Sequence, residues 1–170
     1  MKINTNKKSL EQIKKFFDKN NWKPLPFQIE SWEAYLNGEN GVIQVPTGCG
    51  KTYAALMGPL SKLNNGRKKS GLNILLITPL KALSRDLKNA IDSAAKYFDE
   101  EITVGIRNGD TSQYEKKKQI LNPPNILITT PETLSLLLSN KVSKNIFRNL
   151  FSIIIDEWHE LMGSKRGNQC

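Results

Sequence analysis

The sequence has no long apolar run, no closely spaced cysteines and no leader-like segment at its N-terminus. None of its hydrophobic stretches approaches the roughly 20 residues that a membrane-spanning helix needs. No continuous apolar segment follows the basic N-terminus, so we expect no secretory signal. The two cysteines, Cys49 and Cys170, lie too far apart for a disulfide framework or a cysteine-based metal site. These absences predict a cytoplasmic protein that has no membrane partner.

The net charge is strongly positive. The 170 residues include 25 Lys and Arg against 16 Asp and Glu, which gives a formal net charge of +9. Such an excess favours phosphate-rich ligands such as nucleic acid, because each neutralised phosphate releases counterions. However, many basic proteins bind no nucleic acid, and the lysines of residues 1–24 also fit a helix with a solvated face. Charge alone leaves the nucleic-acid partner open.

Short β-branched runs alternate with helix-like segments along the chain. We expect strands at Val42–Val45, Asn73–Thr78, Ile102–Ile106, Ile126–Thr130 and Ser152–Ile155. We expect helices at Leu10–Asn20, Phe27–Leu36, Thr52–Leu63, Leu80–Phe98, Ser112–Leu121 and Pro131–Ser139. Runs that are apolar throughout indicate a sheet covered on both faces. The pattern predicts an α/β domain with a mainly parallel sheet, whose ligand site lies at the carboxyl ends of the strands.

A glycine-rich segment follows the first expected strand. It reads Val45-Pro46-Thr47-Gly48-Cys49-Gly50-Lys51-Thr52 and leads into a helix. In a P-loop, the backbone N–H groups and the helix N-terminus cradle phosphates, the lysine reaches the β- and γ-phosphates, and the hydroxyl ligates Mg²⁺. Val45 stands where the P-loop pattern has glycine, and a plain turn before a helix is the alternative. Cys49 could be a redox-sensitive thiol at a helix N-terminus, but no partner residue supports that hypothesis over a simple spacer.

Two acidic residues, Asp156 and Glu157, follow the last apolar run directly. Acidic groups at the end of a buried strand need a cation or another partner. Next to a P-loop, Asp156 would hold Mg²⁺ and Glu157 would orient or deprotonate the attacking water. An exposed acidic turn is the alternative for this stretch by itself. Together with the P-loop, the pair predicts a nucleotide hydrolase that uses ATP and Mg²⁺.

These motifs together resemble the DExH-box group of superfamily 2 helicases, in which Asp156-Glu157-Trp158-His159 is the DExH motif. Further segments resemble the Q-motif region and the strand-contacting motifs of that group: Trp22–Gln28, Thr78–Leu83, Asn108–Ser112 and Thr129–Leu134. The run Asp156–Gly167 looks like the large helicase-related (Lhr-like) family, and closest to its bacterial DNA-ligase-associated branch. The resemblance extends from about Trp22 to Gly167.

The resemblance implies roles at the nucleotide site. Gln28 would read the adenine edge, and Trp22 or Phe27 would pack on the base, with ordinary core packing as the alternative for both aromatic residues. His159 would couple the nucleotide site to a neighbouring domain. The remaining nucleotide contacts would come from the P-loop residues Thr47, Gly48, Cys49, Gly50, Lys51 and Thr52.

The resemblance also implies a groove for one nucleic-acid strand. Hydroxyl groups, exposed amides and helix N-termini bind phosphates without reading sequence. For each residue singly, turn formation or helix capping is the alternative, and Thr111 and Thr130 are candidate caps. Lys165 and Arg166 contact DNA or form a solvated turn. The groove would be lined by Pro79, Lys81, Ala82, Arg85, Asn108, Gly109, Asp110, Thr111, Thr129 and Thr130.

A motor of this group has two RecA-like domains. We expect residues 1–21 to form a basic N-terminal helical extension and residues 22–170 to form the first RecA-like domain, incomplete at its C-terminal end and without the second domain. Because the second domain supplies arginine fingers worth about 10³–10⁵ in turnover, the 170 residues alone should be nearly inactive. Asn108 departs from the family pattern, where relatives often carry Thr.

The sequence thus predicts the first motor domain of an ATP-dependent DNA helicase or translocase. The resemblance implies 3′-to-5′ movement on single-stranded DNA, a role in DNA repair, and a DNA ligase and a nuclease as associates. An RNA helicase on the same motor is one alternative. A P-loop protein without a nucleic-acid role, such as a small-molecule kinase, is another, and a passive nucleotide- or DNA-binding module is a third.

Overall fold

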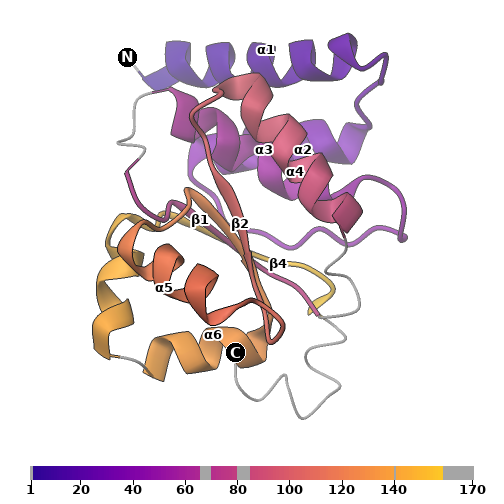
Figure 1. Cartoon of the computed structure of the whole chain (residues 1–170). Coiled ribbons are helices and arrows are strands. Elements are labelled where there is room, and N and C mark those ends of the chain that lie inside the picture. Colours follow the sequence, from indigo (N-terminus) through magenta and orange to yellow (C-terminus); the bar gives the residue numbers. More distant parts are fainter. Residues whose placement is uncertain (1, 66–69, 80–84, 140, 159–170) are drawn as a thin grey trace. The chain divides into compact units, whose positions relative to one another are not determined.

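A computed structural model of the chain describes residues 2–65, 70–79, 85–139 and 141–158 (Figure 1). These residues form two compact units, one containing residues 2–65 and 97–99 and the other containing the described residues among 70–96 and 100–158. Among the described residues, no helix combines the length and the apolar character needed to cross a membrane.

The first unit is helical. It contains α1 (Lys2–Lys19), α2 (Pro26–Asn37) and α3 (Lys51–Asn64). Helices α2 and α3 extend the predicted bounds by one residue at each end, whereas α1 begins eight residues before the predicted Leu10 and ends one residue before the predicted Asn20. Helix α1 buries Ile13, Phe16 and Phe17 and packs on α2 and α3. Its described lysines remain exposed, as expected of a solvated basic face: Lys7, Lys8, Lys14, Lys15 and Lys19.

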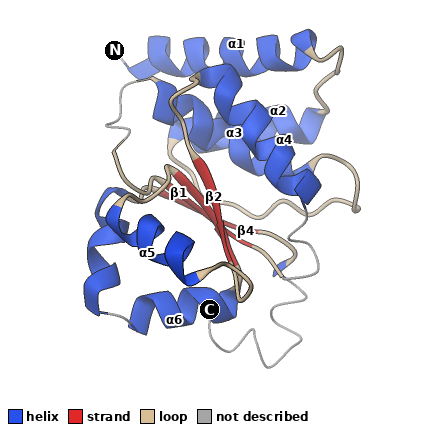
Figure 2. Ribbon diagram, in the orientation of Figure 1, coloured by secondary structure: helices blue, strands red, loops and turns tan. Residues whose placement is uncertain are grey.

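The second unit is built on a four-stranded sheet (Figure 2). Its strands are β1 (Ile74–Ile77), β2 (Val104–Arg107), β3 (Ile126–Thr129) and β4 (Ser152–Ile155), in the order β2-β3-β1-β4. Every pair is parallel, which confirms the predicted parallel sheet. The connecting segments contain α4 (Arg85–Phe98), α5 (Gln113–Leu121), α6 (Pro131–Ser139) and the 3₁₀ helix η1 (Lys141–Asn149), which the sequence did not predict.

One face of the sheet packs on α5, α6 and η1. Leu75, Ile77 and Leu127 from the strands form a buried cluster with Leu137 of α6 and Ile146 of η1. Alternate residues of β1 and β3 point to the opposite face and are also buried, as the uninterrupted apolar runs predict. Strand β4 is the exception, because Ile153 and Ile155 are 58% and 48% exposed at the edge of the sheet.

The predicted strand at Val42–Val45 is wrong. These residues form no strand, and the Val42 side chain is 75% exposed. A β-branched run favours a strand only where a neighbouring strand takes its backbone hydrogen bonds, and no described strand pairs with this segment. The strand predicted at Ile102–Ile106 starts two residues later and ends one residue later, because the N–H of Thr103 donates to the Asn125 side chain and the paired residues begin at Val104.

A polar cluster holds the amino ends of the strands together. Asn125 accepts from the N–H of Thr103 at 2.9 Å and donates from Nδ2 to Oδ1 of Asn73 at 3.1 Å. Asn73 in turn donates to the carbonyl of Asn149 at 3.3 Å. Thr103, Asn125 and Asn73 directly precede β2, β3 and β1, and Asn149 lies three residues before β4, so these bonds join the amino ends of all four strands.

Candidate functional site

The glycine-rich segment folds as a tight turn that leads into α3. Gly48 and Gly50 both adopt left-handed backbone conformations with φ of +81°, and Gly50 is the N-cap residue of the helix. The first helical hydrogen bond runs from the N–H of Ala54 to the carbonyl of Gly50 at 3.2 Å. Lys51 and Thr52 occupy the first turn of α3 and are half-buried, as is Cys49. Glycines with positive φ before a helix N-terminus are typical of phosphate-binding loops, so phosphate binding by this turn stays a prediction.

Gln28 of α2 holds the end of this loop. Its Nε2 donates to the carbonyl of Gly50 at 3.1 Å, and its Oε1 accepts from the N–H of Leu25 at 2.9 Å. The side chain is buried in this position. One N–H and one lone pair of the amide are not used by these two bonds, so adenine recognition remains a prediction.

The aromatic residues near the loop pack on one another. Trp22 lies 6.1 Å from Phe16, 5.9 Å from Phe17 and 5.3 Å from Tyr53, measured between ring centroids. Trp32 is fully buried, and its Nε1 donates to the carbonyl of Tyr53 at 3.0 Å. Burial raises the pKa of Tyr53, because the phenolate loses hydration. Trp22 contacts these rings but is itself 43% exposed, and Phe27 is half-buried, so packing of either residue on a base stays a prediction.

The second unit presents a carboxyl edge, which we define by Pro79, Asn108, Thr130 and Asp156, the residues just beyond β1, β2, β3 and β4. The parallel registers pair Ile77 with both Thr129 and Ile155, and Arg107 with Thr129, so the strands end at the same level. Each predicted motif of this unit therefore reaches the same edge of the sheet.

Asn108 and Thr111 close a turn after β2. The N–H of Asn108 donates to the Thr111 hydroxyl at 2.9 Å, and the N–H of Thr111 donates to Oδ1 of Asn108 at 3.0 Å. Gly109 and Asp110 between them are exposed. Thr111 is not a helix cap, because Ser112 accepts from the N–H of Glu115 at 3.2 Å at the start of α5. The two predicted polar side chains therefore shape a turn that exposes its backbone.

The two threonines after β3 are buried. The Thr129 hydroxyl donates to the carbonyl of Arg107 at 2.8 Å and ties β3 to β2. Thr130 accepts from the N–H of Thr133 at 3.4 Å, so it caps α6 as the capping alternative predicts. Both hydroxyls form hydrogen bonds within the protein, and contacts of these residues with a nucleic-acid strand remain a prediction.

The acidic pair lies at the end of β4. The N–H of Asp156 donates to the carbonyl of Ile77 at 2.8 Å, and Oδ1 of Asp156 accepts from the N–H of Glu157 at 3.0 Å. Glu157 has a φ of +49°, in the left-handed region that few non-glycine residues adopt. Such backbone strain gathers at functional sites, where it positions a side chain. Both carboxylates are half-buried.

Of the remaining predicted site residues, some are described by the structure and some lie outside the described residues. Pro79 is buried after β1, and Arg85 is exposed at the start of α4. Lys81, Ala82 and His159 lie outside the described residues. The described part of the chain contains no group of three or more His, Cys, Asp or Glu side chains that could hold a metal ion.

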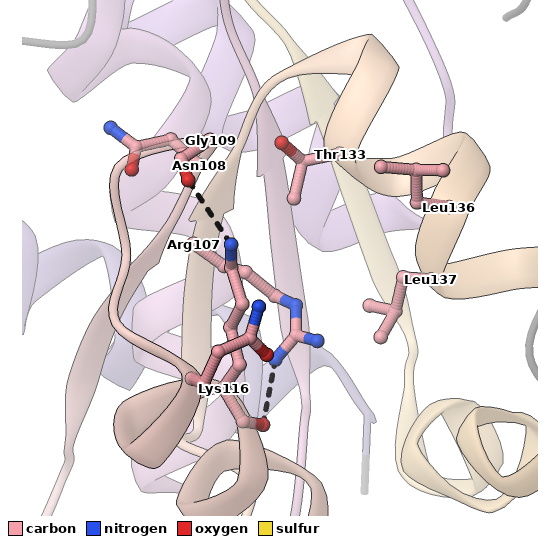
Figure 3. A pocket seen from close by; sticks show the side chains of 8 residues that line it. Arg107, Asn108, Gly109, Lys116, Thr133, Leu136 and Leu137 are labelled. Carbon is pink, nitrogen blue, oxygen red and sulfur yellow. Dashed lines mark hydrogen bonds between the residues drawn. The ribbon is translucent and has the colours of Figure 1, made fainter.

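A pocket lies between the end of β2 and helices α5 and α6, with a volume of about 210 Å³ (Figure 3). None of the sequence motifs includes its two cations, Arg107 and Lys116. The sequence does contain one indication, an arginine at the end of an otherwise uncharged strand. Charged residues are rarely buried unless they have a partner, so such an arginine is a candidate ligand-binding residue. The residues that line the pocket include Arg107, Asn108, Gly109, Gln113, Lys116 and Thr133.

Several known proteins are similar to this chain in sequence and fold. Residues 25–170 match the DEAD/DEAH box helicase family. The chain is 37% identical over 163 residues to Lhr helicase/uracil glycosylase of Escherichia coli, which covers 85% of the chain and 10% of that protein. It is 41% identical over 140 residues to ATP-dependent helicase Lhr-Core of Sulfolobus acidocaldarius, which covers 76% of the chain and 16% of that protein.

Solved structures agree with these relatives. The structure of Mycobacterium smegmatis helicase Lhr bound to ssDNA and AMP-PNP has a TM-score of 0.83 at 32% identity, covering 93% of the chain and 21% of that protein. Helicase MrfA bound to DNA and AMPPNP has a TM-score of 0.78 at 27% identity, covering 94% of the chain and 23% of that protein. The chain thus spans between a tenth and a quarter of the length of these relatives.

Proposed function

The chain belongs to the DEAD/DEAH box helicase family, and we propose that it is the nucleotide- and strand-binding domain of an ATP-dependent DNA helicase or translocase. The observation that carries the proposal is the glycine-rich turn before α3, with Gly48 and Gly50 at φ of +81°, in a chain whose parallel strand β4 is followed directly by Asp156 and Glu157. The relative in Mycobacterium smegmatis was solved with ssDNA and AMP-PNP, which are the two ligands proposed here.

Each chemical role falls to a residue of this chain. The N–H groups of the turn and the Lys51 ammonium would bind the β- and γ-phosphates of ATP. The hydroxyl of Thr52 and the carboxylate of Asp156 are hard oxygen ligands of the kind that Mg²⁺ prefers, and Mg²⁺ would supply charge neutralisation on the phosphates. Glu157 would orient the attacking water and accept its proton. His159 would couple hydrolysis to movement of a neighbouring domain.

The nucleic-acid strand would run along the carboxyl edge of the sheet. The exposed turn at Gly109 and Asp110 offers backbone groups, and Arg85 offers a cation at the surface. Contacts of this type hold a backbone without reading its sequence. We propose 3′-to-5′ movement on single-stranded DNA and a role in DNA repair, with a DNA ligase and a nuclease as associates. These finer assignments rest on the similarity to the Lhr-like helicases and their ligase-associated branch.

The decisive test of the nucleotide site is Lys51→Ala, with Lys96→Ala as the control that removes an equal charge from an exposed site on α4. Titration with AMP-PNP and Mg²⁺ should show affinity falling at least about tenfold for Lys51→Ala, since charge-assisted bonds to phosphate are lost. Lys96→Ala should bind as the unmodified protein does. Equal affinity in both variants would contradict the P-loop assignment.

RNA is the second candidate substrate, because the chain is 30% identical over 155 residues to rice DEAD-box ATP-dependent RNA helicase 16. The rate of ATP hydrolysis by the complete motor should be compared in the presence of oligodeoxythymidylate and of oligouridylate of equal length. Stronger stimulation by the DNA oligomer supports the proposal. Stronger stimulation by the RNA oligomer would assign the motor to RNA.

A further inference from the structure

Arg107 is a buried cation without a counter-charge. Its side chain is 9% exposed, and its Nη1 donates to the carbonyl of Lys116 at 2.8 Å and to Oε1 of Gln119 at 3.4 Å. Both acceptors are neutral, and within the described residues no carboxylate pairs with the guanidinium. Burial lowers the pKa of Arg107, because the charged form loses hydration. Arginine nevertheless stays protonated in proteins, so the positive charge remains.

The guanidinium lines the pocket between β2, α5 and α6. Figure 3 shows it between Lys116 on one side and Thr133 and Leu137 of α6 on the other. The pocket residues include the two cations Arg107 and Lys116 and no acidic side chain. Both side chains line the same partly enclosed surface, so an anion held there would be attracted by two positive charges. The pocket is therefore electrostatically complementary to an anion.

Lys116 connects this pocket to the exposed turn. Its Nζ donates to the carbonyl of Gly109 at 3.1 Å, which leaves two of the three ammonium donors for other acceptors. The pocket volume of about 210 Å³ lies below the roughly 300–1,000 Å³ of pockets that hold drug-sized ligands. Such a volume suits one small anionic group better than a whole nucleotide.

We propose that this pocket binds one phosphate group of the nucleic-acid strand, with Arg107 and Lys116 as its cationic ligands. The planar fork of arginine matches phosphate oxygens geometrically, and the ammonium adds a second charge. This proposal rests on the proposed function, because it places the strand beside the turn at Asn108–Thr111. It assigns the strand two contacts that the sequence motifs did not indicate.

The test leaves Arg107 in place, because replacing a buried arginine can unfold the chain. Gln113 also lines the pocket and is exposed, so Gln113→Glu would supply a carboxylate in competition with phosphate. Lys116→Gln removes one proposed ligand. Lys117→Gln on the same helix is the matched control, because it changes the net charge by the same amount at an exposed position outside the pocket.

Affinity for a labelled twelve-residue oligodeoxythymidylate should be measured at several salt concentrations. We expect Gln113→Glu and Lys116→Gln each to weaken binding about tenfold and to reduce the slope of log K against log salt by about 0.7, the value for one phosphate contact on a single strand. Lys117→Gln should change the affinity less than twofold. If both pocket variants bind as the control does, the proposal is wrong while the proposed function stands.

A second measurement separates strand phosphate from free phosphate. The melting temperature of each protein should be followed in inorganic phosphate and in chloride at equal ionic strength. Gln113→Glu should melt above Lys117→Gln in chloride, because the new carboxylate neutralises the buried charge, and phosphate should stabilise it less. A phosphate effect without any change in oligonucleotide affinity would make the pocket a free-anion site and overturn the strand assignment. Failure of the unmodified protein to bind the oligonucleotide would contradict both proposals.

Discussion

Nε2 of Gln28 donates to the carbonyl of Gly50 across 3.1 Å, and this bond joins the first turn of α2 to the residue that starts α3. The opposite end of the same amide accepts from the N–H of Leu25 at 2.9 Å. One buried side chain thus contacts both the start of α2 and the end of the glycine-rich turn. Gln28 positions the loop in addition to any role in adenine recognition.

Gln28→Glu should damage the loop through this bond. An ionised glutamate can still accept from Leu25 but cannot donate to Gly50, so a carboxylate would face a carbonyl oxygen in a buried position. We expect a loss of about 1–3 kcal/mol in the free energy of unfolding, together with weaker AMP-PNP binding. Urea denaturation and nucleotide titration measure the two effects. Gln44→Glu makes the same chemical change at an exposed residue and should leave both quantities nearly unchanged.

The two left-handed glycines of the loop should differ in their tolerance of alanine. Both have a φ of +81°, so Gly48→Ala and Gly50→Ala each incur backbone strain of about 1–2 kcal/mol. A Cβ at position 48 would meet no atom within 4 Å, whereas a Cβ at position 50 would lie 2.7 Å from Nε2 of Gln28. Gly50→Ala should therefore cost more stability, measured by urea denaturation.

A double-mutant cycle checks the cause of that difference. Combining Gly50→Ala with Gln28→Ala removes the atom that the new Cβ would strike, so the two changes together should cost less than the sum of the single changes. Additive costs would mean that the contact with Gln28 is not what excludes a side chain at position 50.

The amino ends of the strands offer a prediction about stability alone. Asn125→Asp would replace the donor to Oδ1 of Asn73 with a carboxylate oxygen and would bury a charge. We expect a loss of at least about 2 kcal/mol in the free energy of unfolding. Asn122→Asp, at the exposed end of α5, is the control, and it should cost less than about 1 kcal/mol through the helix dipole. Equal losses would show that the asparagine cluster does not hold the strands.

Features that depend on neighbouring residues in the chain could be predicted from the sequence. The turn at Gly48 and Gly50, the capping of α6 by Thr130 and the buried strands β1 and β3 all follow local patterns of glycine, threonine and apolar residues. The run Val42–Val45 has an equally strong pattern, but a strand also needs a partner from a distant part of the chain. Pattern alone therefore misassigned it.

Polar groups that are buried by distant contacts could not be predicted. The motif of Thr129 predicts a contact with a nucleic-acid strand. Its hydroxyl instead donates to the carbonyl of Arg107, 22 residues earlier in the chain. Arg107 itself carries no motif, and its burial depends on the packing of α5 and α6 around the end of β2. The sequence identifies which residue types can do the chemistry, whereas the fold decides which of them face a ligand.

Glu157 tests the proposed hydrolytic chemistry separately from folding. Glu157→Gln keeps the size of the side chain and the left-handed backbone at φ of +49°, so the free energy of unfolding should change by less than about 0.5 kcal/mol. AMP-PNP affinity should be retained, because the proposed phosphate contacts are made by the turn before α3 and not by Glu157. Hydrolysis should fall by about 10²–10⁴, since the amide cannot accept the proton of the attacking water.

Phosphate release from ATP, measured in the complete motor with single-stranded DNA present, is the readout for Glu157→Gln. Glu100→Gln makes the same change at an exposed residue outside the carboxyl edge and should hydrolyse ATP at the unmodified rate. If Glu157→Gln also does so, another residue is the base. If Glu157→Gln instead loses AMP-PNP affinity, the residue acts in nucleotide binding. Its strained backbone would then serve to position a binding group next to Asp156, and the proton would have to leave the attacking water by another path.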